Sequence, residues 1–322
     1  MKVALVTGVS SGIGQATALQ LAQSGYRTFG TVRSDVAPIP NVELVHLDVR
    51  DRDSVEEGIA SVFESARRID VLVNSAGSAL IRAAEETTTD EARDLFETNV
   101  FGVMRMTQAV LPAMRAQRSG RIINISSVLG FLPAPFMSTY AATKHAVEGY
   151  SESLDHEVRN FGVRVIVVEP AFTRTNLGRH NGGPARSLPE YDDVRRRVIA
   201  RVSDNIEHGV DPAIVAEVVL RAATDATPRL RYPVGREAKF LRLLRSIAPE
   251  FVLDRGIRKQ FGLGNVTDPS PGLRPPSPRV PGRGPSNPSP RVAGRGPSSP
   301  SPRARGEGAR SADEGRDLGA TS

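Results

Sequence analysis

The chain has 322 residues, no cysteine and a formal net charge of +6. The absence of cysteine excludes disulfides and Cys-ligated zinc, and no apolar run approaches the ~20 residues of a membrane span. Nine of the 42 Lys and Arg residues follow Gly264, so the rest of the chain is nearly neutral and the basic pI is weak evidence for nucleic-acid binding. We therefore expect a cytoplasmic protein with no metal centre and no nucleic-acid partner.

The N-terminus has the pattern of a strand, a glycine-rich turn and a helix. Residues 2–7 predict a short buried strand, and the turn Gly8-Val9-Ser10-Ser11-Gly12-Ile13-Gly14 follows it. An apolar helical pattern then continues to Gly25. Such a turn lets the backbone approach a pyrophosphate, whose charge the helix N-terminus favours. By itself the same sequence also fits an ordinary tight turn.

Strands and helices alternate through the body of the chain. Further strands are predicted at residues 27–32, 42–47, 71–74, 121–125, 163–169 and 230–234. Helices are predicted at residues 53–66, 90–116, 138–160, 191–206 and 212–223, and Thr88 with Glu91 has the pattern of a capping box. The alternation predicts an α/β fold, a doubly wound parallel sheet covered on both faces.

The stretch 126–144 contains the strongest candidate for chemistry. Tyr140 and Lys144 are four residues apart in a predicted helix, so both side chains lie on one face. A nearby ammonium lowers the pKa of a phenol, and such a pair can exchange a proton with an alcohol oxygen. Ser127 follows a predicted strand and is placed to hold the same oxygen. The alternative is an ordinary Tyr–Lys pair on a helix surface.

Polar and glycine residues occur where the predicted strands end. In a doubly wound sheet, ligands bind at the carboxyl ends of the strands. The residues at those ends are Gly8, Val32, Asp48, Asn74, Ser127 and Pro170. Core residues have no reason to share one edge, so this convergence predicts a binding site there.

The end of the second strand bears on which dinucleotide is bound. A site that prefers NAD usually carries an acidic residue about 20 residues past the glycine-rich turn. This chain has Val32 and then Arg33 there, which predicts NADP, with Ser11 as a further hydroxyl for the phosphate. Asp35 leaves NAD open as the less favoured alternative.

The C-terminal part divides into two segments. Residues 237–264 form a basic amphipathic stretch that predicts a helical extension able to dock on the body, cover the substrate pocket or touch a membrane surface. Residues 265–322 contain a Pro/Arg/Gly/Ser-rich repeat of twelve residues, which predicts a disordered tail. The preceding residues 1–236 are expected to form the single folded domain.

Several motifs together resemble the short-chain dehydrogenase/reductase family over about residues 1–260. The cofactor loop is similar at Thr7-Gly8-xxx-Gly12-Ile13-Gly14, and Asn74-Ser75-Ala76-Gly77 resembles the family's Asn-Asn-Ala-Gly motif with Ser in second place. Asn99, Ser127, Tyr140 and Lys144 match its catalytic tetrad, and residues 170–175 resemble its Pro-Gly-x-Val-x-Thr segment with Ala171 replacing Gly. Residues 31–33 and 47–51 look most like the hydroxysteroid and retinol dehydrogenase branch.

The resemblance implies a Rossmann fold, an oxidoreductase and a homo-oligomer, either a dimer or a tetramer. Tyr140 would be the acid or base, Lys144 would lower its pKa and hold the nicotinamide ribose, Ser127 would orient the carbonyl, and Asn99 would help to hold a water that reaches Lys144. The implied NADP-binding residues are Thr7, Gly8, Ser10, Ser11, Gly12, Ile13, Gly14, Arg33, Asp48, Val49, Asn74, Ala76, Gly77, Tyr140, Lys144, Pro170, Thr173 and Thr175.

Three functions remain open at this point. The first is an NADP(H)-dependent oxidoreductase for a small apolar carbonyl or alcohol, with Phe131, Leu132, Phe136 and Met137 lining the pocket. The second is an NADP-sensing regulator or scaffold that uses the Arg-rich tail. The third is a nucleotide-sugar epimerase, which would need a larger substrate domain than the tail supplies.

Overall fold

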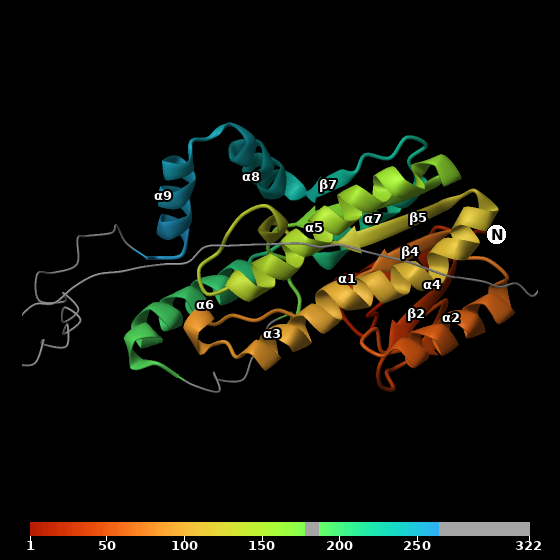
Figure 1. The fold of residues 1–322 in the computed structure, drawn as a ribbon, viewed down its shortest axis with the longest axis horizontal. Coiled ribbons are helices and arrows are strands. Elements are labelled where there is room, and N and C mark those ends of the chain that lie inside the picture. The colour runs from red at the N-terminus through yellow and green to blue at the C-terminus, as the bar shows by residue number, and fades with distance from the viewer. Residues whose placement is uncertain (178–186, 264–322) are drawn as a thin grey trace, which may run out of the picture. The chain divides into compact units, whose positions relative to one another are not determined.

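The computed structural model describes residues 1–177 and 187–263. Within them the chain forms one α/β domain around a seven-stranded parallel sheet (Figure 1). The strand order is β3-β2-β1-β4-β5-β6-β7, so the chain crosses from one half of the sheet to the other between β3 and β4. The predicted doubly wound fold is confirmed. The predicted tail, residues 265–322, lies outside the described residues.

The strands agree closely with the sequence pattern. They are β1 (Val3–Val6), β2 (Arg27–Val32), β3 (Val42–His46), β4 (Val71–Asn74), β5 (Gly120–Ile125), β6 (Val163–Pro170) and β7 (Arg231–Val234). All residues of β1 and β4 are buried, as expected for central strands covered on both faces.

Helices cover both faces of the sheet. They are α1 (Gly12–Gln23), α2 (Arg52–Ala66), α3 (Thr89–Phe96), α4 (Gly102–Gln117), α5 (Ser138–Val158), α6 (Asp192–Glu207), α7 (Pro212–Thr224), α8 (Gly235–Ile247) and α9 (Glu250–Gln260). Alternation along β1 separates the two cores: Ala4 and Val6 pack with α1 and α7, whereas Val3 and Leu5 pack with α2, α4 and α5.

The helix predicted at residues 90–116 is interrupted. A π-helical turn, Glu97–Phe101, separates α3 from α4 and contains the buried Asn99. The predicted capping box at Thr88 and Glu91 is present at the start of α3. Such π-turns occur often at functional sites because the additional residue changes the direction in which a side chain points.

The C-terminal stretch folds as two helices instead of one. Pro249 is the N-cap of α9, and the preceding Ala248 is extended, with ψ 139°. Proline disfavours helical backbone in the residue before it, so α8 ends there.

Candidate active site

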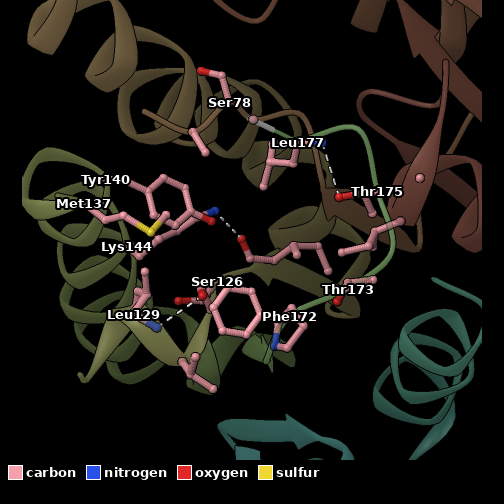
Figure 2. A pocket seen from close by; sticks show the side chains of 18 of the residues that line it. Ser78, Ser126, Leu129, Met137, Tyr140, Lys144, Phe172, Thr173, Thr175 and Leu177 are labelled. Atoms are coloured by element: carbon pink, nitrogen blue, oxygen red, sulfur yellow. Dashed lines mark hydrogen bonds between the residues drawn. The ribbon is translucent and has the colours of Figure 1, made fainter. Parts of the chain in front are cut away.

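The carboxyl ends of the strands surround a cavity of about 930 Å³ (Figure 2). Its wall includes Gly8 after β1, Val32 at the end of β2, Asp48 after β3, Ser127 after β5 and Pro170 at the end of β6. The volume is in the range of ligand and cofactor pockets. The predicted convergence of strand ends therefore produces one site.

The glycine-rich turn has the geometry of a phosphate cradle. Gly8 has φ +72°, and a Cβ on it would lie 2.8 Å from Cα of Ala76. A Cβ on Gly14 would lie 2.2 Å from the carbonyl oxygen of Gly8, so only glycine lets α1 approach the turn this closely. Ser11 is the N-cap of α1 and makes no side-chain capping bond, and the first turn holds no acidic residue. These features fit a dinucleotide pyrophosphate at the helix N-terminus.

Two predicted cofactor residues lie behind this wall. Thr7 is buried, and its hydroxyl accepts hydrogen bonds from the backbone nitrogens of Ser75 and Ala76, each at 3.0 Å. Asn74 donates its side-chain amide to Oδ1 of Asn124 over 2.8 Å. Thr7 thus fixes the loop after β4, whose residues Ala76 and Gly77 line the cavity, and Asn74 joins the end of β4 to β5.

The part of the cavity that bears on the choice between NAD and NADP lies at the ends of β2 and β3. Arg33 is exposed and lines the cavity together with Asp48 and Val49. Asp35 instead faces His46, with 3.2 Å between its Oδ1 and the imidazole Nε2. The Asp35 side chain is 99% exposed and does not line the cavity, whereas Arg33 does.

Tyr140 lies in the first turns of α5 with its ring buried (Figure 2). Burial raises the pKa of Tyr140 to about 12, and a hydrogen bond with the hydroxyl of Ser127 opposes that shift. The Ser127 hydroxyl also accepts a hydrogen bond from the backbone nitrogen of Leu129 over 3.1 Å. Among the described residues the hydroxyl of neighbouring Ser126 has no such partner.

Lys144 lies one helical turn after Tyr140. Its ammonium is 5.7 Å from the centroid of the Tyr140 ring and donates a hydrogen bond to the carbonyl oxygen of Ile125 over 2.8 Å. Burial lowers the pKa of Lys144 to about 8, and the nearby Glu148 carboxylate raises it. Burial, and not the ammonium, therefore dominates the pKa of Tyr140, which differs from the sequence-based expectation.

Asn99 is anchored through every polar atom of its side chain. Its amide donates to the carbonyl of Ser78 over 2.9 Å and to the hydroxyl of Thr143 over 3.1 Å, and its Oδ1 accepts from the backbone nitrogen of Ser78. These bonds tie the π-turn to α5 and to the loop after β4. The side chain is thus a positioning element, and it does not line the cavity.

The sequence did not predict the polar network beneath these residues. Asn124 lies within the apolar β5, accepts from Asn74 and donates to the hydroxyl of Ser151 on α5 over 2.8 Å. Its signal in the sequence was an amide in the middle of a buried strand, because a buried polar group requires partners. Thr143 carries the corresponding bond to Asn99.

Much of the remaining cavity wall is apolar, although Glu91, Asp94, Glu237 and Gln260 also line it. Leu132 and Met137 line it as predicted, whereas Phe131 and Phe136 do not. The guanidinium of Arg242 lies 4.8 Å from the ring centroid of Phe131, and Phe136 packs edge-on against Tyr191 of the short 3-10 helix Pro189–Tyr191. Covering the substrate pocket was one of the three roles that the sequence left open for residues 237–264. The two C-terminal helices supply the lining residues Leu241, Leu244, Val252, Leu253, Ile257 and Phe261.

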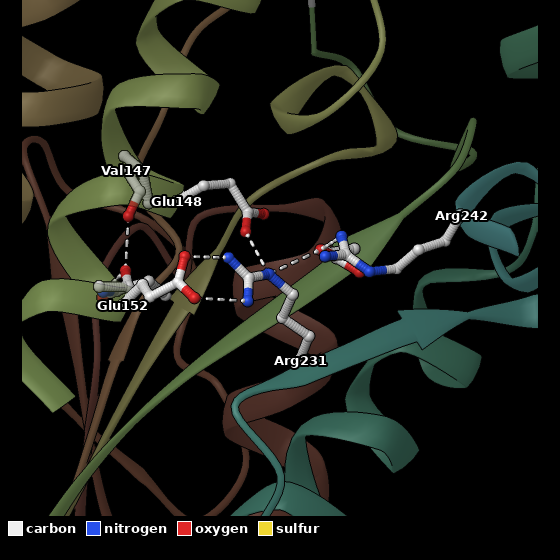
Figure 3. A network of polar contacts seen from close by, with 8 residues as sticks. Val147, Glu148, Glu152, Arg231 and Arg242 are labelled. Atoms are coloured by element: carbon white, nitrogen blue, oxygen red, sulfur yellow. Dashed lines mark hydrogen bonds and ion pairs between the residues drawn. The ribbon is translucent and has the colours of Figure 1, made fainter. Parts of the chain in front are cut away.

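A buried ionic cluster joins α8 to the sheet (Figure 3). Arg242 of α8 forms an ion pair with Glu169, a fully buried residue of β6. Arg231 of β7 bonds to Glu148 over 3.1 Å and lies 3.7 Å from Glu169. Burial and the Glu148 carboxylate raise the pKa of Glu169, and the charges of Arg242 and Arg231 oppose that shift. The cluster holds α8 against the end of β6.

In residues 1–177 and 187–263 no group of three or more His, Cys, Asp or Glu is arranged to bind a metal. In the same residues no helix is both long and apolar enough to cross a membrane.

The sequence matches the short chain dehydrogenase family over residues 2–183, and the chain belongs to that family. An uncharacterized oxidoreductase of Schizosaccharomyces pombe is 36% identical over 225 residues, covering 70% of this chain and 95% of the relative. A 3-ketodihydrosphingosine reductase of Bacteroides thetaiotaomicron is 34% identical, with 73% and 88% covered. Estradiol 17-beta-dehydrogenase 1 of Rattus norvegicus is also 34% identical, with 71% and 72% covered.

Solved structures agree with this assignment. A short-chain dehydrogenase from Streptomyces avermitilis is 37% identical with a TM-score of 0.68, covering 80% of this chain and 97% of its own. A metagenomic short-chain oxidoreductase in complex with NADP is 28% identical with a TM-score of 0.58, covering 72% and 96%. The protein is thus an NAD(P)-dependent short-chain oxidoreductase.

Proposed function

We propose that this enzyme uses NADP(H) to interconvert a carbonyl and a secondary alcohol in an apolar substrate. The observation that carries this proposal is one cavity whose lining includes Tyr140, the glycine-rich turn and many apolar side chains. The family membership supplies the reaction class, and the side chains around Tyr140 support the assignment of roles.

Tyr140 is the proposed acid and base. In reduction its hydroxyl gives a proton to the substrate oxygen, and in oxidation the phenolate takes the proton back. Ser127, which shares a hydrogen bond with Tyr140, orients that oxygen. A bound nicotinamide cofactor supplies or accepts the hydride, and the protein supplies position and electrostatics.

Lys144 and Asn99 are the proposed positioning residues for Tyr140 and Ser127. The lowered pKa of Lys144, about 8, lets its amine exchange a proton near neutral pH. Held by Ile125, it stays between β5 and the Tyr140 ring, where it can also bond the hydroxyls of a nicotinamide ribose. Asn99 fixes the loop after β4 against α5.

The choice of NADP over NAD follows from charge. Val32 is neutral, Arg33 is an exposed cation on the cavity wall, and Asp35 does not line the cavity. A charge-assisted bond from Arg33 to a ribose phosphate contributes about 1.5–3 kcal/mol. The complex of a 28% identical relative with NADP supports this choice.

An apolar substrate follows from the wall opposite the cradle. Its side chains include Leu95, Leu132, Met137, Val202 and Leu253. Relatives named for estradiol and for 3-ketodihydrosphingosine, both largely hydrocarbon molecules, support this class and the steroid branch. We expect a substrate with a hydrocarbon ring system or chain comparable to those two molecules, bound by burial of its hydrocarbon part.

NADPH consumption against a panel of ketones tests the proposal. The panel contains steroid, retinoid, long-chain and simple short ketones, with NADH measured in parallel. We expect turnover with NADPH and a KM that falls as the apolar area of the ketone grows. A panel with no turnover, or a preference for short hydrophilic ketones, would contradict it.

A further inference from the structure

The two C-terminal helices are apolar on two sides. On the inner side, Leu241 and Leu244 of α8 line the cavity. On the outer side, Phe240, Leu243 and Ile247 are 61%, 58% and 71% exposed. Their i, i+3, i+7 spacing places these three on one face of the helix.

The apolar outer side continues on α9. Phe251 is 72% exposed and Val252 41%, and Phe251 follows Ile247 by only four residues. Apart from Met1, no other large apolar side chain in the described residues is more than 43% exposed. A concentration of this kind marks an interaction site. We call Phe240, Leu243, Ile247 and Phe251 the α8–α9 surface; Val252 is left out of it because it also lines the cavity.

Positive charge is concentrated on the same helices. Residues 235–263 contain seven Arg or Lys and three acidic residues, whereas residues 1–234 contain 26 basic and 28 acidic residues. Basic side chains exposed on the two helices are Arg236, Lys239, Arg245, Arg255 and Lys259. Long cationic side chains beside an apolar stripe can extend to phosphate groups while their stems remain in apolar contact.

We propose that the α8–α9 surface binds the face of an anionic lipid bilayer. Amphipathic helices with this pairing of apolar and basic residues lie in the plane of the interface, with the apolar residues below the headgroups. Since the inner sides of α8 and α9 line the cavity, the bilayer and the cavity lie on opposite faces of the same two helices.

A second copy of the chain is a weaker fit to this surface. A two-fold interface would place the α8–α9 surface against itself. It would then bring two segments together that each carry an excess of four positive charges. Anionic headgroups neutralise that excess, whereas a second copy doubles it.

The absence of tryptophan from the chain allows a site-specific test. Phe240→Trp places the sole indole on the α8–α9 surface. Phe161→Trp is the matched control, because Phe161 is 39% exposed but precedes β6, at the opposite edge of the sheet from the cavity. With full-length protein and phosphatidylglycerol-containing vesicles, we expect a blue shift for the indole at 240, none at 161, and a smaller shift with pure phosphatidylcholine.

A loss-of-binding variant completes the test. Phe240→Ser with Leu243→Ser changes no charge, so adsorption by the Arg-rich residues after Gly264 is unaffected. Vesicle co-sedimentation should fall at least about tenfold, with an unchanged thermal midpoint, because two inserted side chains are lost. The proposal is overturned if wild-type protein ignores anionic vesicles, or if the double variant binds equally and the indole at 240 does not shift. A wild-type oligomer that dissociates on this substitution without vesicle binding would also overturn it, and would assign the surface to a second copy.

Discussion

Lys144 donates a hydrogen bond from its ammonium to the backbone carbonyl of Ile125 over 2.8 Å, which fixes the amine between β5 and the ring of Tyr140. This bond links Ile125, the last residue of β5 and two residues before Ser127, to the helix that carries Tyr140. It explains why a buried amine is held at the position that the proposed chemistry needs.

The pH dependence of stability tests this environment through Lys144→Met. Burial lowers the pKa of Lys144 from 10.5 to about 8, so between pH 8 and 10.5 the unfolded chain binds the proton more tightly than the folded one. Lys144 thus destabilises the fold below pH 8, and the penalty disappears as pH rises to 10.5. Relative to the variant, wild-type protein should gain several degrees in thermal midpoint between pH 7 and pH 10.

A matched substitution isolates that effect. Lys239 is exposed on α8. The difference in thermal midpoint between Lys239→Met and wild type should therefore be the same at pH 7 and pH 10. An identical pH dependence in wild type and Lys144→Met would mean that the amine is not held in a low-dielectric site.

Arg242→Met should loosen the attachment of α8. It removes the ion pair with Glu169, which is fully buried and then keeps only Arg231 nearby. Loss of one partner of a partly exposed pair should lower the free energy of unfolding by about 1–3 kcal/mol. Arg245 lies on the exposed side of α8, so Arg245→Met should change the free energy of unfolding little. Equal costs in denaturant titrations of the two variants would exclude an anchoring role for Arg242.

Cofactor preference should change at the end of β2. Val32→Asp places a carboxylate where the ribose phosphate is proposed to bind, and should raise KM for NADPH at least about tenfold, equivalent to about 1.4 kcal/mol. Arg33→Ala should also raise KM for NADPH, while leaving KM for NADH unchanged. A wild-type enzyme that prefers NADH, or a Val32→Asp variant with unaltered preference, would refute the NADP assignment.

Truncation after Gly264 should leave the enzyme folded and active. Among the described residues, those that line the cavity end at Phe261, before the truncation point. Because the repeats after it are rich in Pro, Arg, Gly and Ser, they add no apolar core. We expect kcat/KM and thermal midpoint close to those of the full chain. A large drop in either would show that the removed residues pack on the enzyme or gate its site.

Most of the fold followed from local patterns in the sequence. Buried strands such as β1 have a short apolar run, and a glycine-rich turn marks where β1 passes into α1, so strand ends and their order along the chain were predictable. The break at Ala248 was also readable from Pro249, although the sequence analysis treated the stretch as one segment.

Features that depend on tertiary packing were not predictable. The π-turn around Asn99 has no breaker residue, and it is stabilised by bonds to Ser78 and Thr143, which are distant in sequence. Phe131 and Phe136 are aromatic and were therefore expected in the pocket. The guanidinium of Arg242 instead covers the ring of Phe131, and Tyr191 packs against the ring of Phe136. The pKa of Tyr140 depends on its burial, which spacing to Lys144 alone does not show.

The rate of the Tyr140→Phe variant tests the proposed mechanism most directly. The substitution removes the hydroxyl without opening a cavity, so NADPH binding, followed by cofactor fluorescence, should remain nearly unchanged. We predict loss of nearly all turnover with an apolar ketone that wild-type enzyme reduces. A Tyr140→Phe variant that binds NADPH and keeps a substantial fraction of wild-type kcat would contradict the role of Tyr140 as the proton donor.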